Sequence, residues 1–343
     1  MKLHVEPLDD RGVWDCFWEK NAPGALFQSW EWGEVVKNQS LSLVRYGLYE
    51  DSRLIGIFQI MIVRARRATY LHIRHGPILE RHTLANWKQV LAYLQTIARQ
   101  EGAWFLRFSP QIDDTPDNVK LFTVLGLRPS ITHEVDAERC MLLPLAQTED
   151  ALLSAMRKST RYEIRRSEKM DIHVVRSLDP KDLEKFFDLY RATSKRQHFV
   201  EHEGVAEEFA VYAKTGNAVL LLGYYEQTLM SAAIILFSGN QAIYHHGASI
   251  PSKAPVNYAV QWAAIRMARE RGLAWYNFWG VSPQVNISHP WAGHSLFKRG
   301  FGGMETVKIH AQDYPISPLY GLTRAFEWWQ ERRRGYSSVL YLI

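Results

Sequence analysis

The sequence predicts a mixed α/β (α+β) protein built from two copies of one domain. Two observations carry this prediction: strands alternate with amphipathic helices, and one order of elements occurs twice along the chain. The chain has 343 residues, of which 47% are hydrophobic and 22% charged. This length is typical of two domains of ordinary size, and the composition is that of a globular protein with sizeable cores.

The first copy contains a β-hairpin, a third strand, an amphipathic helix, a fourth strand and a short helix with its turn. In order, these elements span Leu43–Met61, Ala68–Ile73, Leu84–Glu101, Trp104–Phe108 and Leu121–Leu127. The helix shows an apolar stripe that includes Trp87, Val90, Leu91 and Leu94, and Gly102 ends it.

The second copy repeats this order. Its hairpin is Val219–Phe237, its third strand Ala242–Ala248 and its helix Val256–Arg271, which ends at Gly272 as the first helix ends at Gly102. Phe278 corresponds to Phe108, and Leu296-Phe297 with Gly300 corresponds to Leu121-Phe122 with Gly126. We therefore expect a duplicated domain, with residues 1–148 as the first copy and residues 149–343 as the second, including a C-terminal helix over residues 320–334.

The copies differ at one position that carries chemistry. Lys298 lies in the stretch His289–Gly303, between an aromatic residue and a run of glycines, whereas the first copy has Thr123 there. Glycines permit left-handed backbone angles and the close approach of other backbone. An ammonium group there can stabilise an oxyanion that develops during acyl transfer, so Lys298 is the candidate catalytic residue. The alternative is an ordinary surface lysine.

A basic segment, Glu149–Lys169, lies between the copies. Arginines recur at every fourth residue, which lays a basic stripe along one helix. Only Glu163 and Glu168 offset the bases in the core of this segment. The stripe is either a solvated helix face or a surface for nucleic-acid phosphates. The candidate contacts are Arg157, Lys158, Arg161, Arg165 and Arg166.

Further candidates for substrate binding are scattered along the chain. Tyr244 begins the sequence Tyr-His-His-Gly-Ala in the end region of a strand and could face a cleft, and Phe297 either stacks on an unpaired base or belongs to the core. His245 and His246 are adjacent in a predicted strand, so their side chains are expected on opposite faces. His289 and His294 lack a third ligand, and we expect no metal and no cofactor.

With these segments in view, the chain resembles the Fem-type aminoacyltransferases (FemA, FemB and FemX), closest to the compact FemX-like form. Five stretches carry the resemblance: Phe27–Lys37, Arg74–Pro77, Arg157–Lys169, Tyr190–Phe199 and Gly293–Gly303. The resemblance implies two tandem acetyltransferase-like (GNAT) domains without a coiled-coil arm. It also implies that Lys37 and Arg196 bind the diphosphate of a peptidoglycan precursor, that Arg74 lies in the binding region, and that Phe297 and Lys298 lie at the acceptor end of tRNA.

Two positions depart from the family pattern. Ser109 stands where the family often has an acidic residue before Pro110, which leaves the general base unassigned, and Asn277 stands where an Asp is frequent. The turns at Ile73–Pro77 and Ser249–Pro255 contain prolines, which cannot donate the backbone hydrogen bonds of a pyrophosphate cradle. The acyl donor is therefore expected to differ from acetyl-CoA.

The resemblance implies an enzyme that moves an amino acid from aminoacyl-tRNA to an amine of the stem peptide of UDP-MurNAc-pentapeptide or its lipid-linked form. An N-acyltransferase with another donor and a non-catalytic module for anionic polymers or nucleic acid are the alternatives. A net charge of +5 is compatible with an anionic partner. Two cysteines and no apolar leader favour a cytoplasmic protein. The basic, aromatic tail keeps peripheral contact with the inner face of the membrane open.

Overall fold

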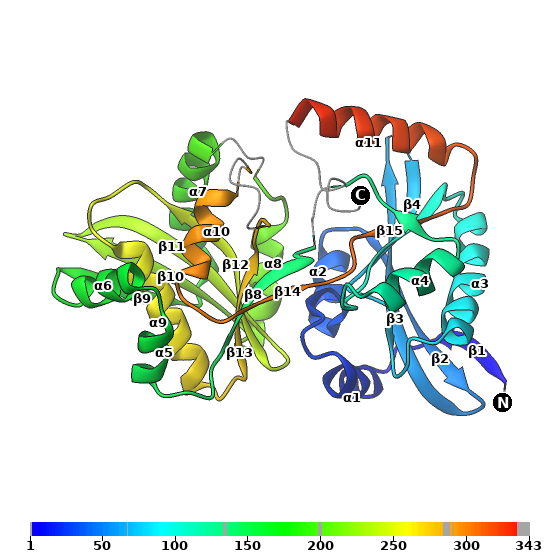
Figure 1. Cartoon of the computed structure of the whole chain (residues 1–343), viewed down its shortest axis with the longest axis horizontal. Coiled ribbons are helices and arrows are strands. Elements are labelled where there is room, and N and C mark those ends of the chain that lie inside the picture. Colours follow the sequence, from blue (N-terminus) through cyan, green and yellow to red (C-terminus); the bar gives the residue numbers. More distant parts are fainter. Residues whose placement is uncertain are drawn as a thin grey trace. The chain divides into compact units, whose positions relative to one another are not determined.

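The computed structural model describes residues 2–66, 68–132, 136–197, 201–283, 289 and 291–334. The chain divides into two compact units, each with its own β-sheet and helices (Figure 1). The first unit consists of Met1–Arg139 together with Thr306–Ile343, and the second of Cys140–Glu305. Both units confirm the predicted mixed α/β fold.

The sheet of the first unit has the strand order β1-β2-β3-β4-β6-β15-β7, and β5 pairs with β3. Strands β4 and β6 run parallel, and the other pairs run antiparallel. The strands are β1 (Leu3–Pro7), β2 (Ser42–Glu50), β3 (Arg53–Ala65), β4 (Ala68–Arg74), β5 (Ile78–Leu79), β6 (Phe105–Ser109), β7 (Arg128–Pro129) and β15 (Gln312–Pro315).

Helices cover both faces of this sheet. Helix α3 packs its stripe, including Trp87, against Phe58 and Ile60 of β3, whereas Ile57 on the opposite face packs against Trp14 of α1. This arrangement follows from the alternation of side chains along a strand. The helices are α1 (Arg11–Asn21), α2 (Trp30–Asn38), α3 (Leu84–Gln100), α4 (Pro116–Val124) and α11 (Tyr320–Arg334), with a 3-10 turn η1 (Leu26–Gln28).

The sheet of the second unit has the order β14-β8-β13-β12-β11-β10-β9, and its parallel pair is β12 with β13. Helix α9 follows β12 and buries Val256, Val260 and Ile265 in the core of the unit. The strands are β8 (Arg139–Pro144), β9 (Ile172–Ser177), β10 (Ala218–Tyr225), β11 (Thr228–Ser238), β12 (Gln241–Ser249), β13 (Trp275–Gly280) and β14 (Met304–Val307). The helices are α5 (Glu149–Ala155), α6 (Lys158–Ser167), α7 (Leu183–Gln197), α8 (Val205–Lys214), α9 (Val256–Glu270) and α10 (Ala292–Arg299), with a 3-10 turn η2 (Pro180–Asp182).

The two units repeat the predicted order of elements. In each, a hairpin leads to a strand, a long helix crosses to a parallel strand, and a short helix follows. Each sheet then accepts a strand from elsewhere in the sequence. Strand β15 lies between β6 and β7, and β8 lies between β13 and β14.

These inserted strands move the domain boundary away from the expected position. Strand β15 pairs with β6, with Asp313 opposite Arg107, and the buried Arg107 guanidinium also donates to Glu327 of α11. The C-terminal segment therefore belongs to the first unit, not to the second as we expected. The tail also packs on the first copy rather than the second.

The basic segment is not one helix. Met156 and Arg157 adopt extended backbone angles between α5 and α6, and the Arg157 amide donates to the Gly300 carbonyl at 3.0 Å. The break precedes the predicted stripe, whose arginines Arg157, Arg161 and Arg165 all lie on α6 from its N-cap residue onward. Among the described helices, none is both long and apolar enough to cross a bilayer.

Candidate active site

Lys298 is buried in the second unit, and only 8% of the residue is exposed. It lies in α10, and its Nζ donates to the Gly280 carbonyl at the end of β13, at 2.7 Å. Burial lowers the pKa of Lys298 to about 7, because desolvation disfavours the ammonium form. The alternative that Lys298 is an ordinary surface lysine is therefore wrong. The corresponding residue of the first unit, Thr123, is exposed on α4.

The glycines near Lys298 allow α10 and the turn after it to pack closely against neighbouring elements. A Cβ at Gly300 would lie 2.4 Å from Thr160 Oγ1, and a Cβ at Gly303 would lie 2.3 Å from the Leu142 carbonyl oxygen. Gly303 also has a φ of 92°. These residues are glycines because α10 and its following turn approach α6 and β8 too closely for a side chain.

Tyr244 lies beside Lys298. The Lys298 Nζ is 5.8 Å from the centre of the Tyr244 ring, within the range of a cation–π contact. Burial raises the pKa of Tyr244 to about 12, so the phenol is neutral. The structure therefore brings Lys298 and Tyr244 together, two candidates that the sequence gives from different motifs.

Phe297 is half-buried in an aromatic cluster of the second unit. Its ring lies 5.0 Å from that of Tyr258 and 5.2 Å from that of Phe301, and both contacts are edge to face. Phe301 is fully buried, and Phe297 packs against the core. The cluster gives Phe297 a fixed orientation while part of its ring stays accessible.

In the first unit, Arg74 is bound by a carboxylate. Its Nε and one terminal nitrogen donate to Asp136 Oδ1 at 2.9 and 2.6 Å, and its guanidinium lies 3.5 Å from the centre of the Phe27 ring. Although burial alone would raise the pKa of Asp136, the charge of Arg74 and the neighbouring His72 hold it well below its usual range. Arg74 is thus fixed, and Asp136 is ionised.

Asp136 also explains the departure at Ser109. The Ser109 hydroxyl donates to Asp136 Oδ2, and His72 Nε2 lies 3.3 Å from the Ser109 hydroxyl. A carboxylate is therefore present at the end of β6, but it comes from residue 136 rather than 109. Sequence reasoning missed Asp136 because this contact joins residues that lie 27 positions apart without any periodic pattern.

The second departure, Asn277, has a structural explanation. Its side-chain oxygen accepts from the Trp279 amide at 2.8 Å, and its Nδ2 donates to Gln241 Oε1 at 3.0 Å. An aspartate could accept the first bond but could not donate the second. The amide therefore suits this buried position, where β13 bulges before Gly280.

The two predicted phosphate ligands, Lys37 and Arg196, differ in the contacts that their side chains make within the protein. Lys37 is exposed at the end of α2 and pairs with Glu34 at 3.1 Å. Arg196 lies in α7, and one terminal nitrogen donates to the Ser249 carbonyl at 2.8 Å. Lys37 belongs to the first unit and Arg196 to the second, so their joint binding of one diphosphate stays a prediction.

The basic residues around α6 divide into two groups. Arg157, Arg161 and Arg166 donate to groups of the protein itself: Ser159, the Ser154 carbonyl and the Lys253 carbonyl, respectively. Lys158 and Arg165 are exposed. Arg166 also lines a pocket of about 210 Å³ with Lys253, Asn257 and Tyr258 at the start of α9.

The expectation that His245 and His246 point to opposite faces is wrong. The register of β12 with β11 passes from Ile234–His246 to Ile235–Tyr244, so His245 is the extra residue of a β-bulge. Both imidazoles therefore reach Glu208 of α8, at 3.1 and 2.8 Å.

The fold and the site define a protein with two GNAT-like units. The chain belongs to the FemAB family, whose model matches residues 11–120, 125–204 and 212–327. The chain is 21% identical over 387 residues to a lipid II:glycine glycyltransferase of Staphylococcus haemolyticus, with 90% of this chain and 92% of that protein covered. The identity to the same-named protein of Staphylococcus aureus is also 21%, with 94% of each covered.

Two solved structures support the fold. A crystal structure of FemX has a TM-score of 0.81 at 19% identity, and the match covers 94% of this chain and 100% of that chain. A tandem GNAT protein from the clavulanic acid biosynthesis pathway has a TM-score of 0.57 at 12% identity, with 92% and 99% covered. These matches confirm the two acetyltransferase-like domains, and the family model confirms the Fem-type resemblance.

Proposed function

We propose that this protein is an aminoacyltransferase that moves an amino acid from aminoacyl-tRNA to an amine of the peptidoglycan stem peptide. The buried Lys298 carries the proposal, because a cation kept from water in a GNAT-like unit suits a reaction that develops negative charge on oxygen. The FemAB family membership and the names of the staphylococcal relatives point to the same reaction class.

In the proposed reaction, the acceptor amine attacks the ester carbonyl of the donor. A C–N bond forms and the ester C–O bond breaks. The tRNA leaves, and the oxygen of its terminal ribose takes up a proton to become a hydroxyl group. Lys298 as an ammonium stabilises the oxyanion of the tetrahedral intermediate. The proton of the attacking amine passes to the substrates or to water, and Phe297 stacks on the terminal base.

The acceptor is proposed to be the lipid-linked precursor, because the relatives are named for lipid II. Lys37 is the proposed phosphate ligand of the first unit, since its side chain is exposed and its ion pair with Glu34 can be exchanged for a phosphate. Arg196 is the proposed ligand of the second unit, with a guanidinium suited to two phosphate oxygens. Arg74 supports the surrounding surface through Asp136 and Phe27.

The donor tRNA is proposed to contact the surface of α6. Lys158 and Arg165 are free to bind phosphates, and Arg157, Arg161 and Arg166 add positive charge nearby. Binding that depends on phosphate contacts weakens as salt rises. Replacing Lys158 and Arg165 with Gln should therefore raise KM for the charged tRNA and reduce the salt dependence of KM.

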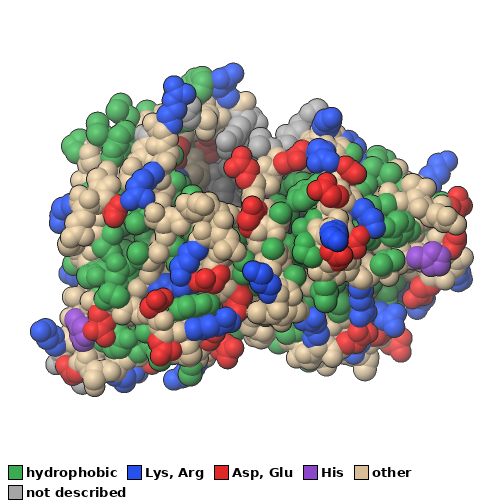
Figure 2. Space-filling view, turned by 180° about the vertical axis from the view of Figure 1, so that it is seen from behind, with side chains coloured by type: hydrophobic (Ala, Val, Ile, Leu, Met, Phe, Trp, Pro, Cys, Tyr) green, Lys and Arg blue, Asp and Glu red, His purple; other side chains and the backbone are tan. Residues whose placement is uncertain are grey.

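Helix α11 is the proposed contact with the membrane. Its protein-facing side holds it on the first unit, because Tyr320 packs against Phe105, Glu327 binds Arg107 and Arg324 donates to the Pro129 carbonyl. Its other side exposes two tryptophans and a leucine, with Arg332 and Arg333 stacked over the tryptophans. The exposed apolar residues are Leu322, Trp328 and Trp329. Figure 2 shows apolar and basic side chains together at the edge of the first unit that α11 forms.

A helix that presents tryptophans and arginines to solvent is suited to the interface of an anionic bilayer. Flotation with vesicles that contain phosphatidylglycerol tests this contact. The double substitution Trp328→Ala with Trp329→Ala should release the protein from the vesicles, whereas Tyr162→Ala, at an exposed aromatic residue of α6, should not. Equal flotation of the wild-type protein and both variants would refute the contact.

Mass spectrometry of the acceptor tests the reaction itself. Purified protein is incubated with a mixture of charged tRNAs and either lipid-linked precursor or UDP-MurNAc-pentapeptide, with and without RNase. A mass gain of one amino acid that requires intact tRNA and is lost in Lys298→Ala supports the proposal. A gain with an acyl-CoA in place of tRNA would establish the other donor, and no gain on either acceptor would contradict the transferase.

A further inference from the structure

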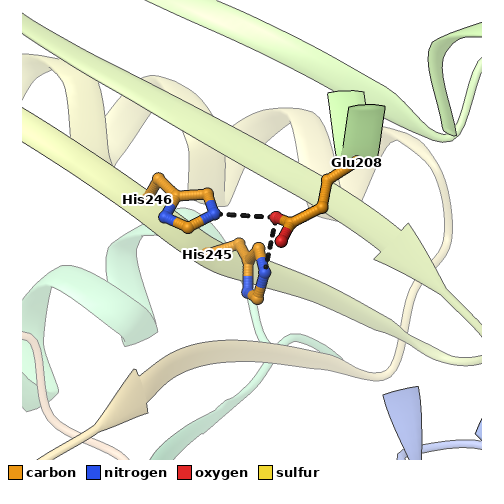
Figure 3. Close-up of side chains that lie close together, drawn as sticks. All are labelled: Glu208, His245 and His246. Atoms are coloured by element: carbon orange, nitrogen blue, oxygen red, sulfur yellow. Dashed lines mark hydrogen bonds and ion pairs between the residues drawn. The ribbon is translucent and has the colours of Figure 1, made fainter. Parts of the chain in front are cut away.

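Three buried side chains of the second unit converge on one point. Glu208 comes from α8, and His245 and His246 come from the bulged strand β12. Both imidazole Nε2 atoms lie within hydrogen-bonding distance of the same carboxylate oxygen, Oε2, at 3.1 and 2.8 Å (Figure 3). The three side chains are only 7–9% exposed. The arrangement arises from the bulge, which turns two successive side chains of one strand toward α8.

The spacing of these donors matches a metal site. Zinc binds imidazole nitrogen and carboxylate oxygen at about 2.0–2.2 Å in tetrahedral geometry, so that its ligand atoms lie about 3.3 Å from one another. The three ligand atoms here all lie within 4.8 Å of one another. A cation could therefore enter among them after a rearrangement of these side chains.

We propose that Glu208, His245 and His246 bind a divalent transition-metal ion, with Zn²⁺ as the ion that best suits two imidazoles and one carboxylate. The geometry supports this assignment. Both imidazoles face the same buried oxygen of Glu208, so the three side chains already converge as a set of nitrogen and oxygen ligands.

The position of the site indicates a structural, positioning role. The ion would join α8 to β12, and the residue before His245 is Tyr244, whose ring lies 5.8 Å from the Lys298 Nζ. The His245 ring also lies 5.3 Å from that of Trp279, at the end of β13. The ring of His202 lies 5.6 Å from that of His246 and packs beside the site. Metal binding would thus fix the strand that carries Tyr244.

Calorimetry with the full chain tests the proposal. Protein that has been stripped with chelator and dialysed is titrated with ZnCl₂, and Co²⁺ is added separately as a spectroscopic probe. We expect one ion per chain, a rise in the thermal midpoint with Zn²⁺, and visible absorption bands of tetrahedral Co²⁺. Failure of the folded wild-type protein to bind Zn²⁺ stoichiometrically would overturn the proposal.

Variants locate the ion. The double substitution His245→Ala with His246→Ala should abolish binding, and Glu208→Gln, which keeps the shape of the side chain, should weaken it by about tenfold or more because an amide is a poorer ligand. His173→Ala is the control, since His173 is an exposed histidine that pairs with Asp171. Circular dichroism checks that each variant is folded, and Glu208→Gln decides the question if the double variant is not. Unchanged affinity in Glu208→Gln would place the ion elsewhere.

Discussion

Each unit of the protein holds a cationic side chain in a fixed position, but the half-buried Arg74 and the buried Lys298 have different partners. In the first unit, the Arg74 guanidinium donates twice to the ionised Asp136. In the second unit, Lys298 donates to a neutral carbonyl, that of Gly280. The first cation is therefore neutralised within the fold, whereas the second is desolvated and its pKa lies at about 7.

The difference separates a cation that supports structure from one that is available for chemistry. A buried charge with a carboxylate partner has little further to gain from a substrate. A buried ammonium without a carboxylate partner, held by a carbonyl and an aromatic ring, gains much more when negative charge develops beside it, because the surrounding dielectric is low. The same domain, duplicated, thus carries a supporting arginine in one unit and a candidate catalytic lysine in the other.

The largest expected effect is on Lys298. Lys298→Ala should lower kcat by about 10²–10³-fold, because a donor to the oxyanion is lost in the transition state. Single-turnover transfer to the precursor, followed by mass spectrometry, measures this effect. Lys185→Ala, which removes an exposed lysine of the second unit that pairs with Asp182, should leave the rate unchanged. Equal rates in the two variants would remove Lys298 from the chemistry.

The next effect is on stability rather than rate. Asp136→Asn should lower the free energy of unfolding by about 3 kcal/mol, because it leaves the Arg74 charge without its carboxylate. Urea denaturation of the purified protein measures the loss. The control is Asp188→Asn, whose exposed side chain pairs with Arg191, and its unfolding curve should overlay that of the wild type. A wild-type curve for Asp136→Asn would show that the pair does not support the fold.

A third prediction concerns pH, with opposite signs for activity and stability. The ammonium form of Lys298 is lost as pH rises through about 7, so kcat/KM should fall by about tenfold per pH unit above that value. Lys298→Arg keeps its charge and should lack this decline, although its activity is lower.

Stability should change in the other direction. The pKa of Lys298 is lower in the folded than in the unfolded state, where it is near 10.5. The folded protein therefore binds fewer protons between pH 7 and 10.5, and its stability relative to Lys298→Met should rise over that range. Denaturation at several pH values measures this difference. A constant difference would show that the ammonium is not desolvated.

Local patterns in the sequence predicted most of the fold. The strands of the two hairpins show a period of 2, and the helices α3 and α9 show a period of 3.6. All of these elements lie close to the residues predicted for them. The inserted strands β8 and β15 could not be predicted in this way, because they pair with strands far away in the sequence. The domain boundaries depend on these pairings, so they were misplaced with them.

The site shows the same division. Lys298 became a candidate because the two copies could be compared residue by residue and because the chain resembles the Fem-type family. Asp136 and Glu208 were missed because each acts through a contact across the fold, with Ser109 and with His246, respectively. The bulge in β12 also defeated the expectation for His245, since a single extra residue reverses the side-chain alternation of a strand. The direction of the His245 side chain depends on the pairing register of β12 with β11, which the composition of the strand does not reveal.

The smallest predicted effect distinguishes two roles of Tyr244. Its ring stabilises the Lys298 ammonium by about 0.5–2 kcal/mol if the contact is a cation–π interaction, and Tyr244→Phe would keep this contribution. Tyr244→Leu should remove it, lower the pKa of Lys298 further, and move the decline of kcat/KM to lower pH. Identical pH profiles for the Phe and Leu variants would mean that the ring only fills space. If Tyr244→Phe alone shifts the profile, the hydroxyl, and not the ring face, controls the proton on Lys298.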